Sequence, residues 1–131
     1  MKFTPQYITR LEPNQIFVFG SNYAGFHGAG AALTALRKFG ARYGQGTGLQ
    51  GQSYGIATKD RKLNVLPLFN IQVQIERFLR FATNHPEFEF LVTEIGCGLA
   101  GYSKAEIGPL FKGLTIPPNV ILPESFWIYI K

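Results

Sequence analysis

Two glycine-rich segments of this chain have the composition of loops that bind phosphate. The first runs from Gly20 to Gly30, and the second, from Gly96 to Gly101, matches the pattern G-x-G-x-x-G. Each follows a short apolar run and precedes a segment with helical spacing, so unblocked backbone amides and a helix dipole would favour an anion there. Either loop could instead serve only to turn the chain. Two such loops in one small domain favour a phosphate-containing ligand.

Three side chains near these loops could contribute to a site, and each has a structural alternative. Asn22 could hydrogen-bond a sugar hydroxyl, or it could bond its own backbone in a turn. Lys59 opens the basic stretch Lys59-Asp60-Arg61-Lys62, which could reach an anion or form a solvated turn. Tyr102 could stack on a base or a ribose, or it could pack internally.

The cysteine and histidine residues favour neither metal binding nor thiol chemistry. Cys97 is the single cysteine, and no base or cation is placed to lower its pKa, so we expect it to pack or to contribute its backbone. His27 and His85 are too far apart for the usual zinc spacing, and we expect a structural role for His27. The sequence therefore predicts no metal site and no cofactor.

The elements that must position these residues alternate between strands and helices. Apolar runs typical of strands are 16–19, 54–57, 88–95, 120–122 and 126–130. Helical spacing is found in 28–39, which Gly40 ends, in 71–82, which His85-Pro86 ends, and after Ser103, which forms a capping box with Glu106.

The alternation predicts an α/β fold, a sandwich with a mainly parallel sheet. In such sheets, ligands bind at the carboxyl ends of the strands, where both glycine loops are expected. The uncharged segment 43–53 contains four glycines, at positions 44, 46, 48 and 51. We expect it to be a loop whose backbone adopts positive φ or approaches a ligand closely.

Length and composition favour one small domain spanning residues 1–131. The chain has 131 residues, a formal charge of +5 and one cysteine, which excludes an internal disulfide. Residues 1–13 lack the apolar core of a signal peptide, and no stretch approaches the roughly 18 consecutive apolar residues of a membrane span. We therefore expect a cytoplasmic protein without membrane contact, and the sequence leaves its oligomeric state open.

The G-x-G-x-x-G pattern by itself suggests a Rossmann dinucleotide domain, but its position argues against one. A Rossmann domain begins with this pattern, whereas here the pattern begins at Gly96 of 131 residues. The acidic residue expected about 20 residues later has only Glu124 as a candidate, which stands somewhat late.

The order of these motifs resembles that of macrodomains, the α/β/α modules that bind ADP-ribose. The resemblance implies a three-layer α/β/α sandwich with a mixed, mostly parallel central sheet. The likeness rests on the Asn22 loop after a strand, the helix opening Gly28-Ala29-Gly30-Ala31-Ala32 and the run from Ile95 to Tyr102, and it extends from about Ile16 to Phe111. The chain is also similar to small bacterial and phage proteins that carry the run Phe19-Gly20-Ser21-Asn22. Within macrodomains, the nearest branch is that of the terminal ADP-ribose protein glycohydrolases.

The resemblance implies a role for each matching residue. In the first loop Asn22 would contact the distal ribose, and Gly20, Gly28 and Gly30 would let the backbone approach the ligand. The diphosphate would be wrapped by the second loop: Gly96, Cys97, Gly98, Leu99, Ala100, Gly101 and Tyr102. Lys59 matches the lysine with which the glycohydrolase branch attacks the anomeric carbon of ADP-ribose.

One departure limits what the resemblance implies for catalysis. The glycohydrolase branch uses an aspartate at the position of Ala100, so half of the catalytic pair is absent here. Asp60, Glu94 or His27 could replace it if the fold brought one of them within hydrogen-bond reach of the distal ribose. Loss of a positioned carboxylate commonly costs about 10²- to 10⁴-fold in rate, whereas binding should survive.

Three functions follow from these observations and stay open. The first is binding of ADP-ribose or an ADP-ribosylated protein, as a binding module or as a non-catalytic module that sequesters a nucleotide signal. The second is hydrolysis of ADP-ribosyl esters, or processing of a related signalling nucleotide, with Lys59 as nucleophile or electrostatic stabiliser. The third, nucleic-acid binding, is suggested by the charge of +5 and by 12 Phe, 6 Tyr and 1 Trp, but the cations are dispersed and most aromatics fall in apolar runs.

Overall fold

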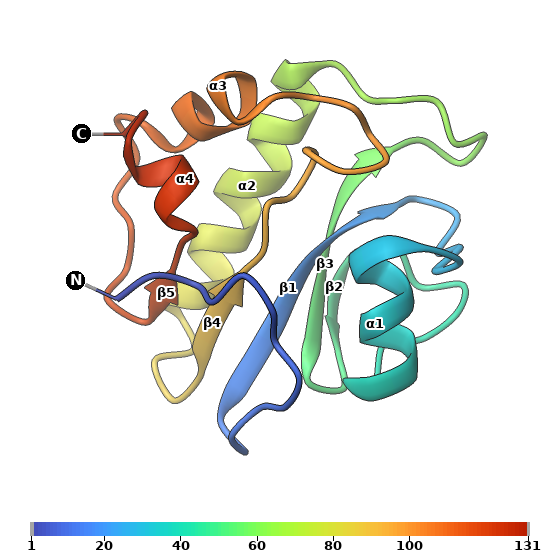
Figure 1. Ribbon diagram of the computed structural model, residues 1–131, viewed down its shortest axis with the longest axis horizontal. Helices are drawn as coiled ribbons and strands as arrows, with labels where there is room; N and C mark the ends of the chain where they lie inside the picture. The colour runs from blue at the N-terminus through green and yellow to red at the C-terminus, as the bar shows by residue number, and fades with distance from the viewer. Residues whose placement is uncertain (1, 131) are drawn as a thin grey trace.

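A computed structural model describes residues 2–130 and shows three layers, of which the middle one is a five-stranded sheet (Figure 1). The strands are β1 (Gln15–Asn22), β2 (Gly48–Gln50), β3 (Ser53–Lys59), β4 (Glu89–Val92) and β5 (Val120–Ile121), in the order β2-β3-β1-β4-β5. All neighbouring pairs are parallel except β2 and β3. The predicted α/β class with a mixed, mostly parallel sheet is therefore confirmed.

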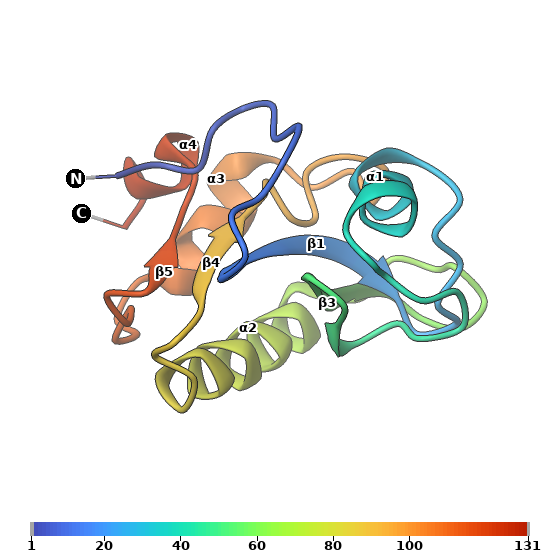
Figure 2. The ribbon, with the colours of Figure 1, turned by 90° about the horizontal axis from the view of Figure 1, so that it is seen from below.

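The helices lie on both faces of this sheet. Helix α1 (Gly30–Lys38) covers one face and α2 (Leu68–Thr83) covers the other (Figure 2). Helices α3 (Lys104–Ile107) and α4 (Glu124–Trp127) and the 3₁₀ helix η1 (Gly108–Phe111) contribute to the core on the α2 side. None of the helices described in residues 2–130 is both long enough and apolar enough to cross a bilayer.

Strand β1 is the centre of the molecule because both of its faces are buried. Side chains alternate between the two faces of a strand. Accordingly Phe17 and Phe19 join the core under α1, while Ile16 and Val18 join the core under α2. The predicted capping box also forms, because Ser103 Oγ accepts from the Glu106 N–H while Glu106 accepts from the Ser103 N–H. It fixes the start of α3 directly after the second glycine loop.

Two predicted elements differ from the structure. The prediction of a strand at 126–130 is wrong: Pro123 is the N-cap of α4, Glu124 lies in its first turn and Phe126 is buried. An acidic residue in the first turn favours a helix, and this local signal outweighs the strand propensity of the apolar residues. The segment 43–53, predicted as loop, contains the edge strand β2, whose backbone pairs with β3.

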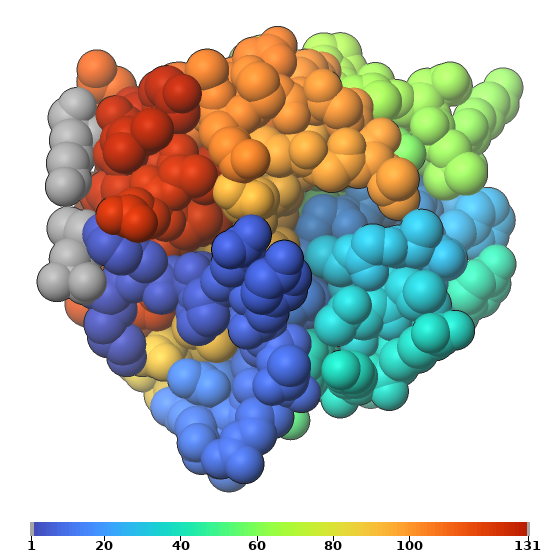
Figure 3. Space-filling model, viewed as in Figure 1, coloured from blue at the N-terminus to red at the C-terminus, as the bar shows by residue number. Residues whose placement is uncertain are grey.

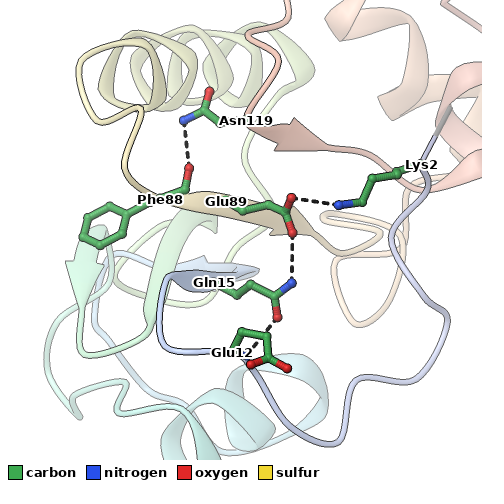
Figure 4. Close-up of polar contacts among 6 residues, drawn as sticks. All are labelled: Lys2, Glu12, Gln15, Phe88, Glu89 and Asn119. Atoms are coloured by element: carbon green, nitrogen blue, oxygen red, sulfur yellow. Dashed lines mark hydrogen bonds and ion pairs between the residues drawn. The ribbon is translucent and has the colours of Figure 1, made fainter.

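Polar contacts fix the register of β1 and β4 at their amino ends (Figure 4). Gln15 Nε2 donates to one carboxylate oxygen of Glu89 at 2.9 Å, and Lys2 Nζ donates to the other at 2.9 Å. These two hydrogen bonds hold the pKa of Glu89 below its ordinary value. Asn119 Nδ2 donates to the Phe88 carbonyl oxygen at 3.1 Å. With this register set, β1 and β4 end near each other, where the two glycine loops begin.

Candidate functional site

A cleft of about 550 Å³ opens at the carboxyl ends of β1 and β3. One wall is the first glycine loop with the start of α1, and the opposite wall is the second glycine loop. Figure 3 shows the hollow between the cyan surface of α1 and the orange surface of the second loop, with blue atoms of β1 at its floor. The two glycine loops, more than sixty residues apart in the sequence, therefore line one cleft.

The two loops touch at the floor and at the rim of this cleft. A β-carbon on Gly20 would lie 3.4 Å from the Gly96 amide nitrogen, and one on Gly30 would lie 3.8 Å from Leu99 Cδ1. Glycine at position 20 therefore keeps the end of β1 close to the second loop. The side chain of Leu99, which is 70% exposed, faces the start of α1 across the rim.

Backbone N–H groups from both walls lack an acceptor within residues 2–130. They belong to the first turn of α1 and to the tip of the second loop: Gly30, Ala31, Ala32, Gly98, Leu99 and Ala100. The N-cap of α1 is Ala29, which has no side chain able to accept from them. Unsatisfied N–H groups and the positive end of a helix dipole attract anions.

Lys59 ends β3 and lines the same cleft. Its ammonium group forms no ion pair with any residue in the described part of the chain. Lys59 also holds the first loop in place, because its carbonyl oxygen accepts from the Tyr23 N–H at 3.1 Å. The cleft thus combines a free cation with two sets of free amides.

Three groups, Asp60, Glu94 and His27, were candidates for the carboxylate role that the resemblance assigns to position 100, and of these only Glu94 lines the cleft. The Asp60 carboxylate accepts from the N–H groups of Asn64 and Lys62, which hold its pKa below the ordinary value and close a turn. His27 is fully buried, and its Nε2 donates to the Gln45 carbonyl oxygen at 2.9 Å. The Glu94 carboxylate accepts from Ser125 Oγ at 2.5 Å and lies 3.7 Å from Lys104 Nζ.

The amide of Asn22 is used within the first loop. Its Nδ2 donates to the Phe26 carbonyl oxygen at 2.9 Å, and its Oδ1 accepts from the Phe26 N–H at 3.0 Å. Asn22 lines the cleft but is only 8% exposed. The geometry is that of the turn alternative, and a contact of Asn22 with a sugar hydroxyl stays a prediction.

Most of the residues predicted for binding line the cleft, and three residues of the second loop do not. The lining includes Gly20, Asn22, Gly28, Gly30, Gly96, Gly98, Leu99 and Ala100, whereas Cys97, Gly101 and Tyr102 lie outside it. Gly101 adopts a φ of +86° in the turn that ends the loop. Tyr102 packs against the core, and its hydroxyl donates to the Leu66 carbonyl oxygen at 2.6 Å.

A second groove, of about 790 Å³, adjoins the cleft and was not predicted from the sequence. The two hollows share Ala31, Thr93, Glu94 and Gly98, and the far wall of the groove is the N-terminal segment 3–9. Cys97 lines this groove. Burial, and then the charge of Glu94, raise the pKa of its thiol to about 11. No motif marks segment 3–9, because an irregular segment that lies over a sheet carries no periodic pattern.

The glycines of segment 43–53 serve backbone packing within the chain. A β-carbon on Gly46 would lie 2.0 Å from the Asn22 carbonyl oxygen, and one on Gly51 would lie 2.6 Å from the Gly40 carbonyl oxygen. Positive φ occurs at Gly44, Gly48 and Gly51, as predicted. The backbone of this segment therefore approaches other backbone segments of the same protein closely, whereas the prediction offered a close approach to a ligand.

No family model, no curated protein and no solved structure matches this chain. Within residues 2–130, no three His, Cys, Asp or Glu side chains come together in a way that could hold a metal ion. The chemistry of the site therefore follows from its own geometry: an anion in the cleft would lie among residues of both loops whose N–H groups are free, and Lys59 lines the same cleft.

Proposed function

We propose that this protein binds ADP-ribose or a related ADP-ribosyl nucleotide in the cleft between its two glycine loops. The observation that carries the proposal is the convergence of free N–H groups from the start of α1 and from the second loop on one hollow that also contains Lys59. Two opposed sets of amides suit the two adjacent phosphates of a diphosphate better than a single carboxylate.

The shape of the surface supports one orientation of this ligand. The diphosphate would lie between Ala31 and Gly98, and the distal ribose would lie toward Asn22 and Lys59. The adenosine would extend into the second groove, which is continuous with the cleft through Ala31, Thr93 and Glu94. Both hollows together offer room for a nucleotide with a group at each end.

Hydrolysis of ADP-ribosyl esters is the second candidate, favoured by the presence of Lys59 and Glu94 in one cleft. An amine must lose a proton before it attacks, and a carboxylate within reach could take that proton. Glu94 is engaged by Ser125 and lies near Lys104, so it would have to turn away from them. We therefore propose binding as the primary function and hydrolysis as a secondary one.

Calorimetric titration with ADP-ribose and AMP tests the primary function. We expect ADP-ribose to bind with a Kd well below about 1 mM, which corresponds to about 4 kcal/mol, and AMP to bind more weakly because it lacks the diphosphate and the distal ribose. Ala31→Pro removes one free N–H at a position in the first helical turn where proline is tolerated. The loss of one charge-assisted hydrogen bond should weaken ADP-ribose binding about 10-fold or more.

Ala31→Ser is the matched control because it changes the same residue but keeps the N–H. Its Kd for ADP-ribose should stay within about 3-fold of that of the wild type, and both variants should keep the wild-type melting temperature within a few degrees. If ADP-ribose binds no more tightly than about 1 mM, or if Ala31→Pro and Ala31→Ser bind it equally, the proposed site is wrong.

A further inference from the structure

Phe26 and Tyr43 form a stacked pair of exposed rings beside the Lys59 end of the cleft. Their ring centroids are 5.6 Å apart with an angle of 27° between the planes. Phe26 is 46% exposed and Tyr43 is 68% exposed. Phe26 lines the cleft, and Tyr43 packs against it from outside the cleft. Neither ring belongs to a hydrophobic core.

The backbone around this pair is held firmly in place. Asn22 bonds both the N–H and the carbonyl of Phe26, and the Gly44 N–H donates to the Gly25 carbonyl oxygen at 2.9 Å. A β-carbon on Gly25 would lie 2.3 Å from the Gly44 carbonyl carbon, so the two loops are in direct backbone contact. The backbone that carries the two rings is thus ordered before any ligand arrives, which reduces the entropy lost on binding.

Other apolar side chains complete the rim at this end. Leu63, at a φ of +67°, and Leu99 are exposed and line the cleft from two further loops. The lining that contains Lys59 therefore also includes one exposed aromatic and two exposed aliphatic side chains. A hydrated sugar hydroxyl or a carboxylate gains little from such a lining, whereas a planar ring gains stacking and apolar contact.

We infer that Phe26, supported by Tyr43, stacks on a planar heterocycle attached to the distal ribose, so that the cleft prefers a dinucleotide over free ADP-ribose. This inference rests on the proposed function and names the ligand class of the same site: a nicotinamide dinucleotide. Lys59 forms no ion pair among residues 2–130 and would repel a cationic ring. The neutral ring of NADH should therefore bind more tightly than the cationic ring of NAD⁺.

Calorimetry with ADP-ribose, NAD⁺ and NADH tests the inference. Stacking of a ring on an aromatic side chain should make NADH bind about 5- to 100-fold more tightly than ADP-ribose. Phe26→Leu keeps an apolar side chain but removes the ring. It should abolish most of this preference, because the Kd for NADH should rise much more than the Kd for ADP-ribose. Phe69→Leu, which changes a 73% exposed ring on α2 outside the cleft, is the matched control and should keep the preference.

The results separate this inference from the proposed function. If ADP-ribose binds but NADH binds no more tightly, the inference is wrong and the proposed function stands. An equal loss of affinity for ADP-ribose and NADH in Phe26→Leu would also overturn it, because the ring would then support the loop or the ribose. If neither ligand binds, both proposals fail.

Discussion

Gly20 and Gly96 face each other under the floor of the cleft, and a β-carbon on Gly20 would come within 3.4 Å of the Gly96 amide nitrogen. Gly20 lies near the end of β1, and Gly96 opens the second loop a few residues after β4. Because β1 and β4 are parallel neighbours, their two following loops meet at the same edge of the sheet. The two glycine motifs, which are separate in the sequence, therefore line one site.

Alanine substitutions at Gly96 and Gly98 should separate the stability of the second loop from its binding role. Gly96 has a φ of +76°, and a β-carbon there would lie 2.8 Å from Ile107 Cδ1. Gly96→Ala should therefore lower the free energy of unfolding by about 1–3 kcal/mol. A β-carbon on Gly98 would meet nothing within 4 Å, so Gly98→Ala should change that free energy by less than about 0.5 kcal/mol.

Urea denaturation followed by circular dichroism measures both effects. Gly98→Ala is also the sharper probe of binding, since it adds a methyl group to the lining of the cleft without disturbing the fold. We expect its Kd for ADP-ribose to rise severalfold. A Gly96→Ala variant as stable as the wild type would show that the second loop does not pack against α3 as described.

Asn22 could act as a turn residue or as a ligand contact, and the free energy of unfolding of two variants tests the first interpretation. Asn22→Ala removes both hydrogen bonds to the Phe26 backbone and should lower the free energy of unfolding by about 1–3 kcal/mol. In Asn22→Asp one oxygen can still accept from the Phe26 N–H, but the other faces the Phe26 carbonyl oxygen, so part of the loss should remain. If both variants unfold at the wild-type urea concentration, the two hydrogen bonds of Asn22 to Phe26 do not stabilise the loop, and the turn interpretation is wrong.

The sequence was sufficient to predict those helices and strands whose side chains are buried in a regular pattern. The apolar run of β1, the stripe of α2 and the capping box at Ser103 and Glu106 are all local signals, and the structure shows each of them. The prediction failed at 126–130, where a helix start at Pro123 and Glu124 overrides an apolar run. Composition alone does not distinguish these two outcomes.

The candidate site was only partly predictable for a similar reason. Glycine loops mark places where the backbone is unblocked, and eight of the eleven residues proposed for binding line one cleft. The second groove depends on segment 3–9, and the aromatic rim depends on backbone contact between Gly25 and Gly44. Both are long-range contacts between irregular segments, which carry no periodicity that a sequence could reveal.

Cys97 should be a slow nucleophile despite lying beside a groove. Burial raises the pKa of its thiol to about 11, so at pH 8 the thiolate fraction should be about 200-fold smaller than for a free cysteine with a pKa near 8.5. Alkylation by iodoacetamide, followed by intact mass, should be slower by about that factor and should accelerate about tenfold per pH unit up to pH 10. The chain unfolded in urea is the control, and equal rates for the folded and unfolded chains would contradict the burial of this thiol.

Restoring the carboxylate at Ala100 tests whether Lys59 can act in hydrolysis. Ala100 and Lys59 line the same cleft. The glycohydrolase branch that the sequence resembles has an aspartate at the position of Ala100. Ala100→Asp should raise the rate of cleavage of an ADP-ribosyl glutamate ester by about 10²- to 10⁴-fold, because a positioned carboxylate can take the proton from the Lys59 amine as this amine displaces the glutamate carboxylate from the anomeric carbon. Water would then hydrolyse the lysine adduct and release ADP-ribose. Ala100→Asn, which has nearly the same size but no basic oxygen, should not raise the rate. Adding Lys59→Ala to Ala100→Asp should remove the gain, and a double variant as fast as Ala100→Asp would exclude Lys59 from the reaction.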